Sequence, residues 1–294
     1  MPRRVLPGAI KMITRRCSER RFFLRPDSDV VQAWLYCLAL VQHKYGLVVH
    51  DFVMMSNHHH IIVRDQSDSP ECWRDLHALL ARCLNARFGR WAAFWDDRPY
   101  NDVRLVDEHD VISKAAYVLS NPVDAGLVKY SCDWLGATSC RLAYGQSIEV
   151  RRPKFFFSND MPETLTLAIT RPDILPALSD AEVRQRVLAA TKDREWSGHE
   201  RLRKAGGTYL GMKRVLRQDR EASPNSREPR RGIRPTVAAM NQWARIQALQ
   251  LTRQWRAQYE DARRRWLEGE AHVLFPYGTY LLRRVHAVCV AAPP

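Results

Sequence analysis

Apolar and polar positions follow two different periods along the first half of the chain. Apolar residues recur at helical spacing from Asp29 to Tyr45 and again from Trp73 to Phe88, and a glycine follows each stretch. A third helical pattern runs from Glu108 to Ser120. We expect this helix to stop at Asn121-Pro122, because proline has no N–H with which to continue a helix.

Strand patterns lie between these helices. They are Lys11–Cys17, Leu47–Phe52, which leads into a histidine-bearing strand Val53–Val63, then Ala93–Trp95 and Val103–Val106. Strands and helices therefore alternate along the chain. This order predicts an α+β fold, a ferredoxin-like antiparallel sheet with helices packed on it.

The pattern changes after about residue 145. The later segments are a basic linker 151–154, an amphipathic helix Ser179–Arg194, a turn with a short basic helix 206–218, and a long helix Val237–Glu268. A Pro/Arg-rich segment near residues 223–236 is expected to be extended or mobile. We therefore divide the chain into a domain of residues 1–145 and a basic, mainly α-helical C-terminal region of residues 146–294.

Composition narrows the class of protein. The chain has 294 residues, of which 46% are hydrophobic, enough to bury a sizeable core. No stretch reaches the roughly 18 apolar residues of a membrane span, and the basic start lacks the apolar centre of a secretory signal. The seven cysteines form no CxxC pair, which argues against a disulfide framework and a structural zinc site. We expect a cytoplasmic protein with no membrane partner, associated with the nucleoid when bound to DNA.

The positive charge lies almost entirely in the second half. The formal net charge is +14, of which residues 1–150 carry +2 and residues 151–294 carry +12, mostly as arginine. The planar guanidinium suits phosphate contacts, so a nucleic-acid partner is the leading hypothesis. A solubilising charged face or a disordered tail is the alternative, because basic composition by itself indicates little.

Three consecutive histidines lie within the histidine-bearing strand. Successive side chains of a strand face opposite sides, so His58 and His60 share one face and His59 points to the other. Two neighbouring imidazoles supply half of a metal site. The alternative is a polar cluster at the end of a strand. We expect His59 to be packed and hydrogen-bonded rather than to bind metal.

A reaction partner for such a metal lies on the third helix. Tyr117 and Asn121 stand four residues apart, so they share a helix face. A phenol is a poor nucleophile until a cation stabilises its anion or the charge developing on a phosphate. From periodicity alone, a tyrosine on an apolar helix face is more often a core residue.

These motifs together resemble the single-tyrosine HUH transposases, and among them the REP-associated tyrosine transposases. The similarity rests on Met-Ser-Asn before His58-His59-His60 and on the segment Tyr117–Val128, which reads Tyr-Val-Leu-Ser-Asn-Pro-Val-Asp-Ala-Gly-Leu-Val. The opening Ile13–Phe23 is also similar, and the resemblance covers about residues 8–145. His59 departs from the family pattern, in which the middle position is usually hydrophobic or aromatic.

The resemblance implies a nickase and strand transferase that acts on single-stranded or hairpin DNA. His58 and His60 would bind Mg²⁺ or Mn²⁺, and Asn121 matches the third metal ligand. Tyr117 would attack the scissile phosphate and leave a 5′-phosphotyrosine and a free 3′-OH, and a second 3′-OH could reverse the step. Members of the family often work as dimers, so the resemblance leaves both monomer and homodimer open.

Two basic segments are expected to contact DNA. One is the basic turn Arg15–Arg25, in which cations lie close to two phenylalanines; its predicted DNA contacts are Arg15, Arg16, Arg20 and Arg21. The other is a helix-turn-helix-like segment 201–220, whose predicted contacts are Lys213, Arg214 and Arg217. A solvated basic helix is the alternative for the second segment.

Two other functions remain open from the sequence. One is a non-catalytic protein that binds DNA hairpins and regulates or marks repeated elements. The other is a metal-dependent nuclease that uses water as its nucleophile, which would make Tyr117 dispensable. Covalent attachment of cleaved DNA to the protein distinguishes the enzyme from both.

Overall fold

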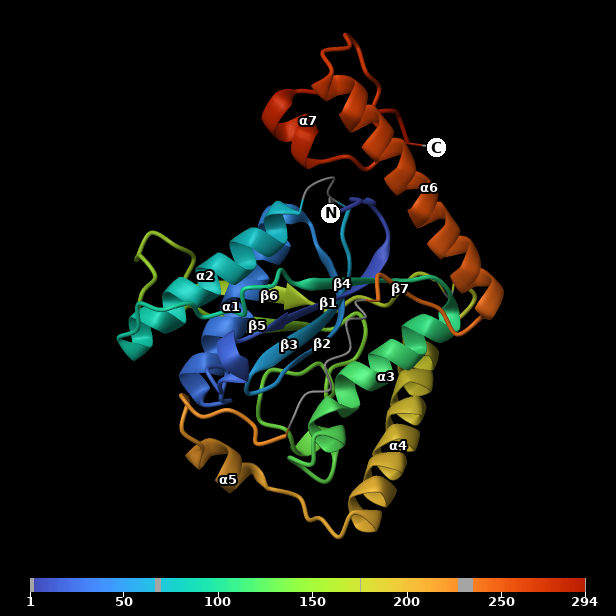
Figure 1. Ribbon diagram of the computed structural model, residues 1–294. Coiled ribbons are helices and arrows are strands. Elements are labelled where there is room, and N and C mark those ends of the chain that lie inside the picture. Colours follow the sequence, from blue (N-terminus) through green and yellow to red (C-terminus); the bar gives the residue numbers. More distant parts are fainter. Residues whose placement is uncertain (1–2, 67–69, 175, 227–234, 294) are drawn as a thin grey trace.

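A five-stranded sheet forms the centre of the computed structural model, which describes residues 3–66, 70–174, 176–226 and 235–293 (Figure 1). The strands lie in the order β2 (Val48–Met54), β3 (His58–Arg64), β1 (Ile10–Arg16), β4 (Asn101–Leu105) and β7 (Val237–Ala238). The first four pair antiparallel, and β7 pairs parallel with β4. The predicted α+β class is therefore confirmed.

Helices cover both faces of this sheet. On one face lie α1 (Ser28–Tyr45) and α2 (Glu71–Phe88), and on the other lies α3 (Glu108–Asp124) with α4 (Asp180–Lys204) packed outside it (Figure 1). Alternate strand residues supply the two cores. In β3, for example, Ile61 and Val63 pack on the α1 side and Ile62 on the α3 side.

The ends of the first helix show how the local sequence sets an element. Asp27 caps α1, because its carboxylate accepts a hydrogen bond from the N–H of Val30 at 3.3 Å. Gly46 ends the helix at φ +64°, a left-handed conformation that glycine adopts without steric cost. The predicted helix Asp29–Tyr45 therefore agrees with α1 at its end and to within one residue at its start.

The predicted stop of the third helix at Asn121-Pro122 is wrong. Pro122 lies inside α3, which continues to Asp124. The missing proline N–H costs one hydrogen bond near the end of the helix. Asn121, Pro122 and Val123 are all buried, and Ala125 N donates to the carbonyl of Asn121 at 3.0 Å, so packing and the closing turn outweigh that loss.

The histidine-bearing strand is also shorter than predicted. Val53 and Met54 belong to β2, residues 55–57 form a turn, and His58 begins β3. Met55 N donates to the carbonyl of His58 at 2.8 Å and closes this hairpin. Ser56 and Asn57 are typical turn residues, which explains the break in an otherwise apolar run.

Other differences lie at short or late segments. The predicted strand Ala93–Trp95 contributes only one isolated bridge, between Cys17 and Trp95. The predicted helix Val237–Glu268 begins as β7, and helix α6 (Gln242–Leu267) starts after its N-cap Asn241. An unpredicted hairpin of β5 (Ser147–Arg151) and β6 (Thr164–Ala168) packs beside α1. Residues 227–234 of the expected mobile segment lie outside the described residues.

The last part of the chain forms a small unit of its own. Helix α6 and the short α7 (Leu281–His286) enclose a separate core, whose buried residues are Trp255, Tyr259, Ala262, Val273 and Phe275. Figure 1 shows this unit above the sheet, near the N-terminus of the chain. Val5 N donates to the carbonyl of Gly278 at 3.0 Å, which ties the unit to the start of the chain.

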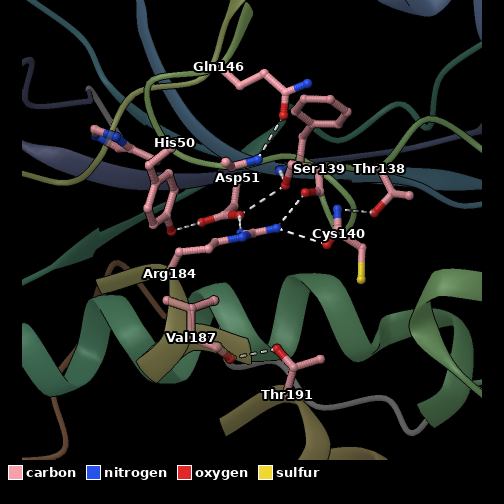
Figure 2. A network of polar contacts seen from close by, with 12 residues as sticks. His50, Asp51, Thr138, Ser139, Cys140, Gln146, Arg184, Val187 and Thr191 are labelled. Atoms are coloured by element: carbon pink, nitrogen blue, oxygen red, sulfur yellow. Dashed lines mark hydrogen bonds and ion pairs between the residues drawn. The ribbon is translucent and has the colours of Figure 1, made fainter. Parts of the chain in front are cut away.

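Helix α4 is fixed to the sheet by a buried ion pair (Figure 2). Arg184 of α4 donates to Asp51 of β2 at 2.9 Å, and their side chains are 7% and 0% exposed. An element beyond residue 145 is thus packed into the same structure as the sheet. The division of the chain at residue 145 stays a prediction.

Two general expectations can be compared with the described residues. None of the helices found there is both long and apolar enough to cross a membrane. All seven cysteines lie in the described part of the chain and are free thiols.

Candidate active site

The two outer histidines and the tyrosine lie together between β3 and α3. The ring centroids of His58 and His60 are 4.9 Å apart, and those of His60 and Tyr117 are 5.3 Å apart. Strand alternation brings both imidazoles to the α3 face of the sheet. The structure therefore brings together residues that are about 60 positions apart in the sequence.

Hydrogen bonds orient both imidazoles. His58 Nδ1 lies 2.7 Å from the side-chain oxygen of Asn57, which can only accept, so Nδ1 carries the proton and Nε2 the lone pair. His60 Nδ1 lies 2.7 Å from the hydroxyl of Thr14 on β1. A hydrogen bond to one ring nitrogen fixes the orientation of the imidazole, so that its other nitrogen points toward a ligand. The histidines that bind metal ions in proteins commonly have such a partner.

The second nitrogen of His60 is a buried polar atom without a partner. Its Nε2 has no hydrogen bond to any described residue, although the side chain is only 4% exposed. Burial, with His58 nearby, holds the pKa of His60 well below its ordinary value, so the ring is neutral. A neutral imidazole can bind a metal ion through Nε2 when the ring proton lies on Nδ1 and is donated to the Thr14 hydroxyl.

The donor set around this atom suits a divalent cation. Asn121 lies one helical turn beyond Tyr117 and is hydrogen-bonded to its side chain. Its amide oxygen could serve as a metal ligand together with the two imidazoles. Within the described residues, no group of three or more His, Cys, Asp or Glu side chains has metal-binding geometry. The candidate ligands are therefore His58, His60 and Asn121, whose metal-binding role stays a prediction.

Tyr117 is partly buried beside the histidines. Burial raises the pKa of its phenol, while the hydrogen bond with Asn121 and the charges of Arg194 and Arg16 act in the opposite direction. Asp124 opposes them and raises the pKa further. The phenol is therefore protonated at neutral pH in the protein as it stands, and its reactivity depends on nearby cations.

Two cations beside Tyr117 were not predicted from the sequence. The Nζ of Lys114 lies 5.5 Å from the centroid of the tyrosine ring, and the guanidinium carbon of Arg194 lies 5.2 Å from it. Lys114 could have been found from helical spacing, because it precedes Tyr117 by three residues. Arg194 could not, since it comes from α4 and lies outside the segment that carries the resemblance.

The middle histidine belongs to the opposite face of the sheet. The indole N–H of Trp34 donates to His59 Nδ1 at 3.0 Å, so His59 carries its proton on Nε2 and donates to His77 Nε2 at 3.2 Å. His59 is fully buried. The expectation that His59 is packed and hydrogen-bonded is confirmed, and His77 is its unforeseen partner.

Most arginines of the basic turn already have partners within the protein. Arg15 donates to the carbonyl of Asp96 at 3.1 Å, and Arg20 donates to the carbonyl of Ser226 at 2.6 Å. Arg21 forms ion pairs with Glu19 and with Glu221. Arg16 pairs in register with His58 across β1 and β3, and its charge acts to lower the pKa of both His60 and Tyr117. The predicted DNA contacts of these four residues stay predictions.

A late segment of the chain lies against this basic turn. Residues 218–226 contact it beyond the Arg20–Ser226 hydrogen bond: Phe22 N donates to the carbonyl of Ala222 at 3.0 Å, Arg25 donates to the carbonyl of Gln218 at 2.8 Å, and Arg21 pairs with Glu221. Any DNA that uses these arginines would have to compete with these contacts.

The second predicted DNA contact lies elsewhere on the surface. Lys213, Arg214 and Arg217 are exposed on helix α5 (Met212–Arg217), which has fewer than two turns. The segment before it is fixed to the end of α3, because Leu210 N donates to the carbonyl of Gly126 at 2.9 Å. The three cations are accessible, and their binding role stays a prediction.

This chain matches four chains of solved structures, among them the two that follow. No family model and no curated protein matches it. A REP-associated tyrosine transposase bound to a REP hairpin is 19% identical, with a TM-score of 0.40, over 47% of this chain and 81% of that chain. A transposase candidate from Deinococcus radiodurans R1 is 16% identical, with a TM-score of 0.30, over 40% of this chain and 94% of that chain.

Proposed function

We propose that this protein is a metal-dependent single-stranded DNA endonuclease and strand transferase, a single-tyrosine transposase that acts at hairpin-forming sequences. The observation that carries the proposal is the contact between His60 of β3 and Tyr117 of α3, with His58 and Asn121 beside them. A buried imidazole with an unpaired nitrogen next to a partly buried phenol is a costly arrangement for a purely structural core.

The proposed reaction is a phosphoryl transfer to the tyrosine. The Tyr117 oxygen forms a bond to phosphorus as the P–O3′ bond of the DNA breaks. The phenol proton passes to solvent, and the departing 3′ oxygen takes a proton from solvent. The products are a 5′-phosphotyrosine and a free 3′-OH, and attack by another 3′-OH returns the phosphate to DNA without an external energy source.

Each residue of the site has a stated part in this reaction. His58, His60 and Asn121 would hold Mg²⁺ or Mn²⁺, which when bound supplies positive charge to the scissile phosphate. Asn121 also bonds the Tyr117 side chain and thereby orients the nucleophile. Lys114 beside the ring favours the phenolate by its charge.

The test is a search for a covalent protein–DNA adduct. Full-length protein is incubated with single-stranded oligonucleotides that contain imperfect palindromes, with Mn²⁺ or with EDTA, and the products are run on a denaturing gel. We expect an adduct that needs metal and is lost in Tyr117→Phe. Tyr130→Phe is the matched control, because Tyr130 is 43% exposed and lies outside the site.

Other outcomes would support different functions. Metal-dependent cutting that persists in Tyr117→Phe without any adduct would identify water as the nucleophile. Hairpin binding without cutting on every oligonucleotide would support the non-catalytic binding protein.

A further inference from the structure

We infer that Arg194, on a helix of the C-terminal half, contacts the phosphate that Tyr117 attacks and is a catalytic residue of the same site. The inference rests on the proposed function. The guanidinium carbon of Arg194 lies 5.2 Å from the centroid of the Tyr117 ring. Arg194 lies on α4, outside residues 8–145, so the site includes an element beyond the segment that carries the motifs.

Two hydrogen bonds hold the guanidinium in place. Arg194 Nε donates to the hydroxyl of Ser120 at 3.0 Å, and its Nη2 donates to Asp124 at 2.9 Å. Tyr117, Ser120 and Asp124 occupy positions i, i+3 and i+7 of α3 and therefore share one face of that helix. The guanidinium is thus attached to the same face that carries the nucleophile.

The third nitrogen of Arg194 remains available for a ligand. Nη1 makes no hydrogen bond to any described residue, and the side chain is 36% exposed. A guanidinium that is anchored by two nitrogens loses little conformational freedom when the third binds, because its plane is already fixed. Its remaining N–H groups suit the non-bridging oxygens of a phosphodiester.

The charges around Tyr117 fit a phosphate better than a neutral core. Lys114 lies 5.5 Å from the ring centroid, and burial together with the charge of Arg194 lowers the pKa of Lys114. Like charges held this close repel each other in the free protein. A phosphate between them would relieve that repulsion. As the P–O bonds change, negative charge develops on the phosphate oxygens, and preorganised donors stabilise the transition state most at such atoms.

Arg201 provides the comparison that separates catalysis from structure. It also donates to Asp124 from α4, seven residues beyond Arg194, but its side chain is 60% exposed. Among the described residues it has no ring contact with Tyr117. Both arginines therefore hold α4 against the same carboxylate, and only Arg194 reaches the nucleophile.

The experiment compares Arg194→Gln, Arg194→Lys and Arg201→Gln in the full-length protein. Cleavage of a palindromic oligonucleotide that the wild type cuts is followed in single turnover at saturating DNA with Mn²⁺. The dissociation constant of the same DNA is measured in EDTA, and thermal unfolding is measured for each variant. Wild type and Tyr117→Phe are included in every series.

We expect Arg194→Gln to slow single-turnover cleavage by about 10²-fold, the loss typical for one transition-state donor, with less than about a 3-fold change in the dissociation constant. Arg194→Lys should recover part of the rate, because it restores the charge. Arg201→Gln should cut within about 3-fold of wild type. Each glutamine variant loses a contact to Asp124, and Arg194→Gln also loses the hydrogen bond to Ser120, so it should unfold at a somewhat lower temperature but remain folded at the assay temperature.

Equal cleavage rates in Arg194→Gln and Arg201→Gln would overturn the inference and leave the proposed function intact, provided that wild type forms the adduct and Tyr117→Phe does not. A rate loss that only follows the fraction of Arg194→Gln unfolded at the assay temperature would also overturn it. Failure of the wild type to form any adduct would overturn the proposed function and the inference together.

Discussion

Replacing Arg184 by methionine is expected to destabilise the protein strongly. Arg184 Nη1 donates to Asp51 at 2.9 Å, and its Nη2 donates to the carbonyl of Cys140 at 3.0 Å (Figure 2). Asp51 also accepts hydrogen bonds from the hydroxyls of Ser139 at 2.9 Å and Tyr144 at 2.6 Å. The arginine is therefore the only cation that the structure shows paired with this fully buried carboxylate among the described residues.

The expected magnitude follows from the burial of both groups. Removing one partner of a buried ion pair leaves an uncompensated charge and costs about 3–5 kcal/mol. This is a large share of a typical total stability of about 5–15 kcal/mol. Asp51→Asn should cost a comparable amount, whereas the double variant Asp51→Asn/Arg184→Met should cost less than the sum of the two.

The assay is urea unfolding of the full-length protein, followed by tryptophan fluorescence. Arg186→Met is the matched control, because Arg186 lies on the same helix but forms an exposed pair with Glu108 at 3.1 Å. An exposed pair contributes at most about 1 kcal/mol. If Arg184→Met unfolds within about 1 kcal/mol of Arg186→Met, α4 is not held to β2 as described and the argument is refuted.

Three further outcomes are expected. Glu221→Gln should raise hairpin affinity at low salt by a few fold, because it removes a carboxylate that pairs with Arg90 and one of the two carboxylates that pair with Arg21; unchanged affinity and salt dependence would contradict a role of these arginines in DNA binding. Adduct formation should reach its midpoint at lower Mn²⁺ than Mg²⁺, because imidazole donors are softer than the oxygen ligands Mg²⁺ prefers; equal midpoints would contradict this. Burial lowers the pKa of His50 to about 4, below its unfolded value, so its stabilising contribution is present above about pH 6.5 and is lost as pH falls toward 4. Urea unfolding from pH 7 to pH 4 should show this loss, and His50→Gln should reduce the slope by about 1.4 kcal/mol per pH unit, so an unchanged slope would contradict the assignment.

The central sheet and its first helices could be predicted because local sequence specifies them. Helix α1 has a carboxylate at its cap, apolar residues at helical spacing and a glycine at its end. The hairpin of β5 and β6 could also have been found, because Ile148 and Val150, and then Leu165 and Leu167, alternate with polar residues. The continuation of α3 through Pro122 could not, because burial of its last turn decides it.

The candidate site divides in the same way. Alternation along a strand was enough to place His58 and His60 on one face, and helical spacing was enough to place Asn121 beside Tyr117. The approach of Arg194 to Tyr117 depends on how α4 docks on α3, and no local period in the sequence encodes that docking. The pairing of Arg21 with Glu221 could not be predicted either, because it depends on how a late segment docks on the basic turn.

The hydrogen-bonded pair of His59 and His77 helps to fix the register of β3, and with it the position of the candidate site. Sliding β3 by one residue would turn His59 toward Tyr117 and drive its two neighbours into the apolar core. Such a slip would also break the hydrogen bond from Trp34 to His59 and leave His77 without its donor. Both polar groups would then be buried without a partner. The alignment of the imidazoles on the reactive side of the sheet is therefore enforced from the opposite side, by residues that no substrate would touch.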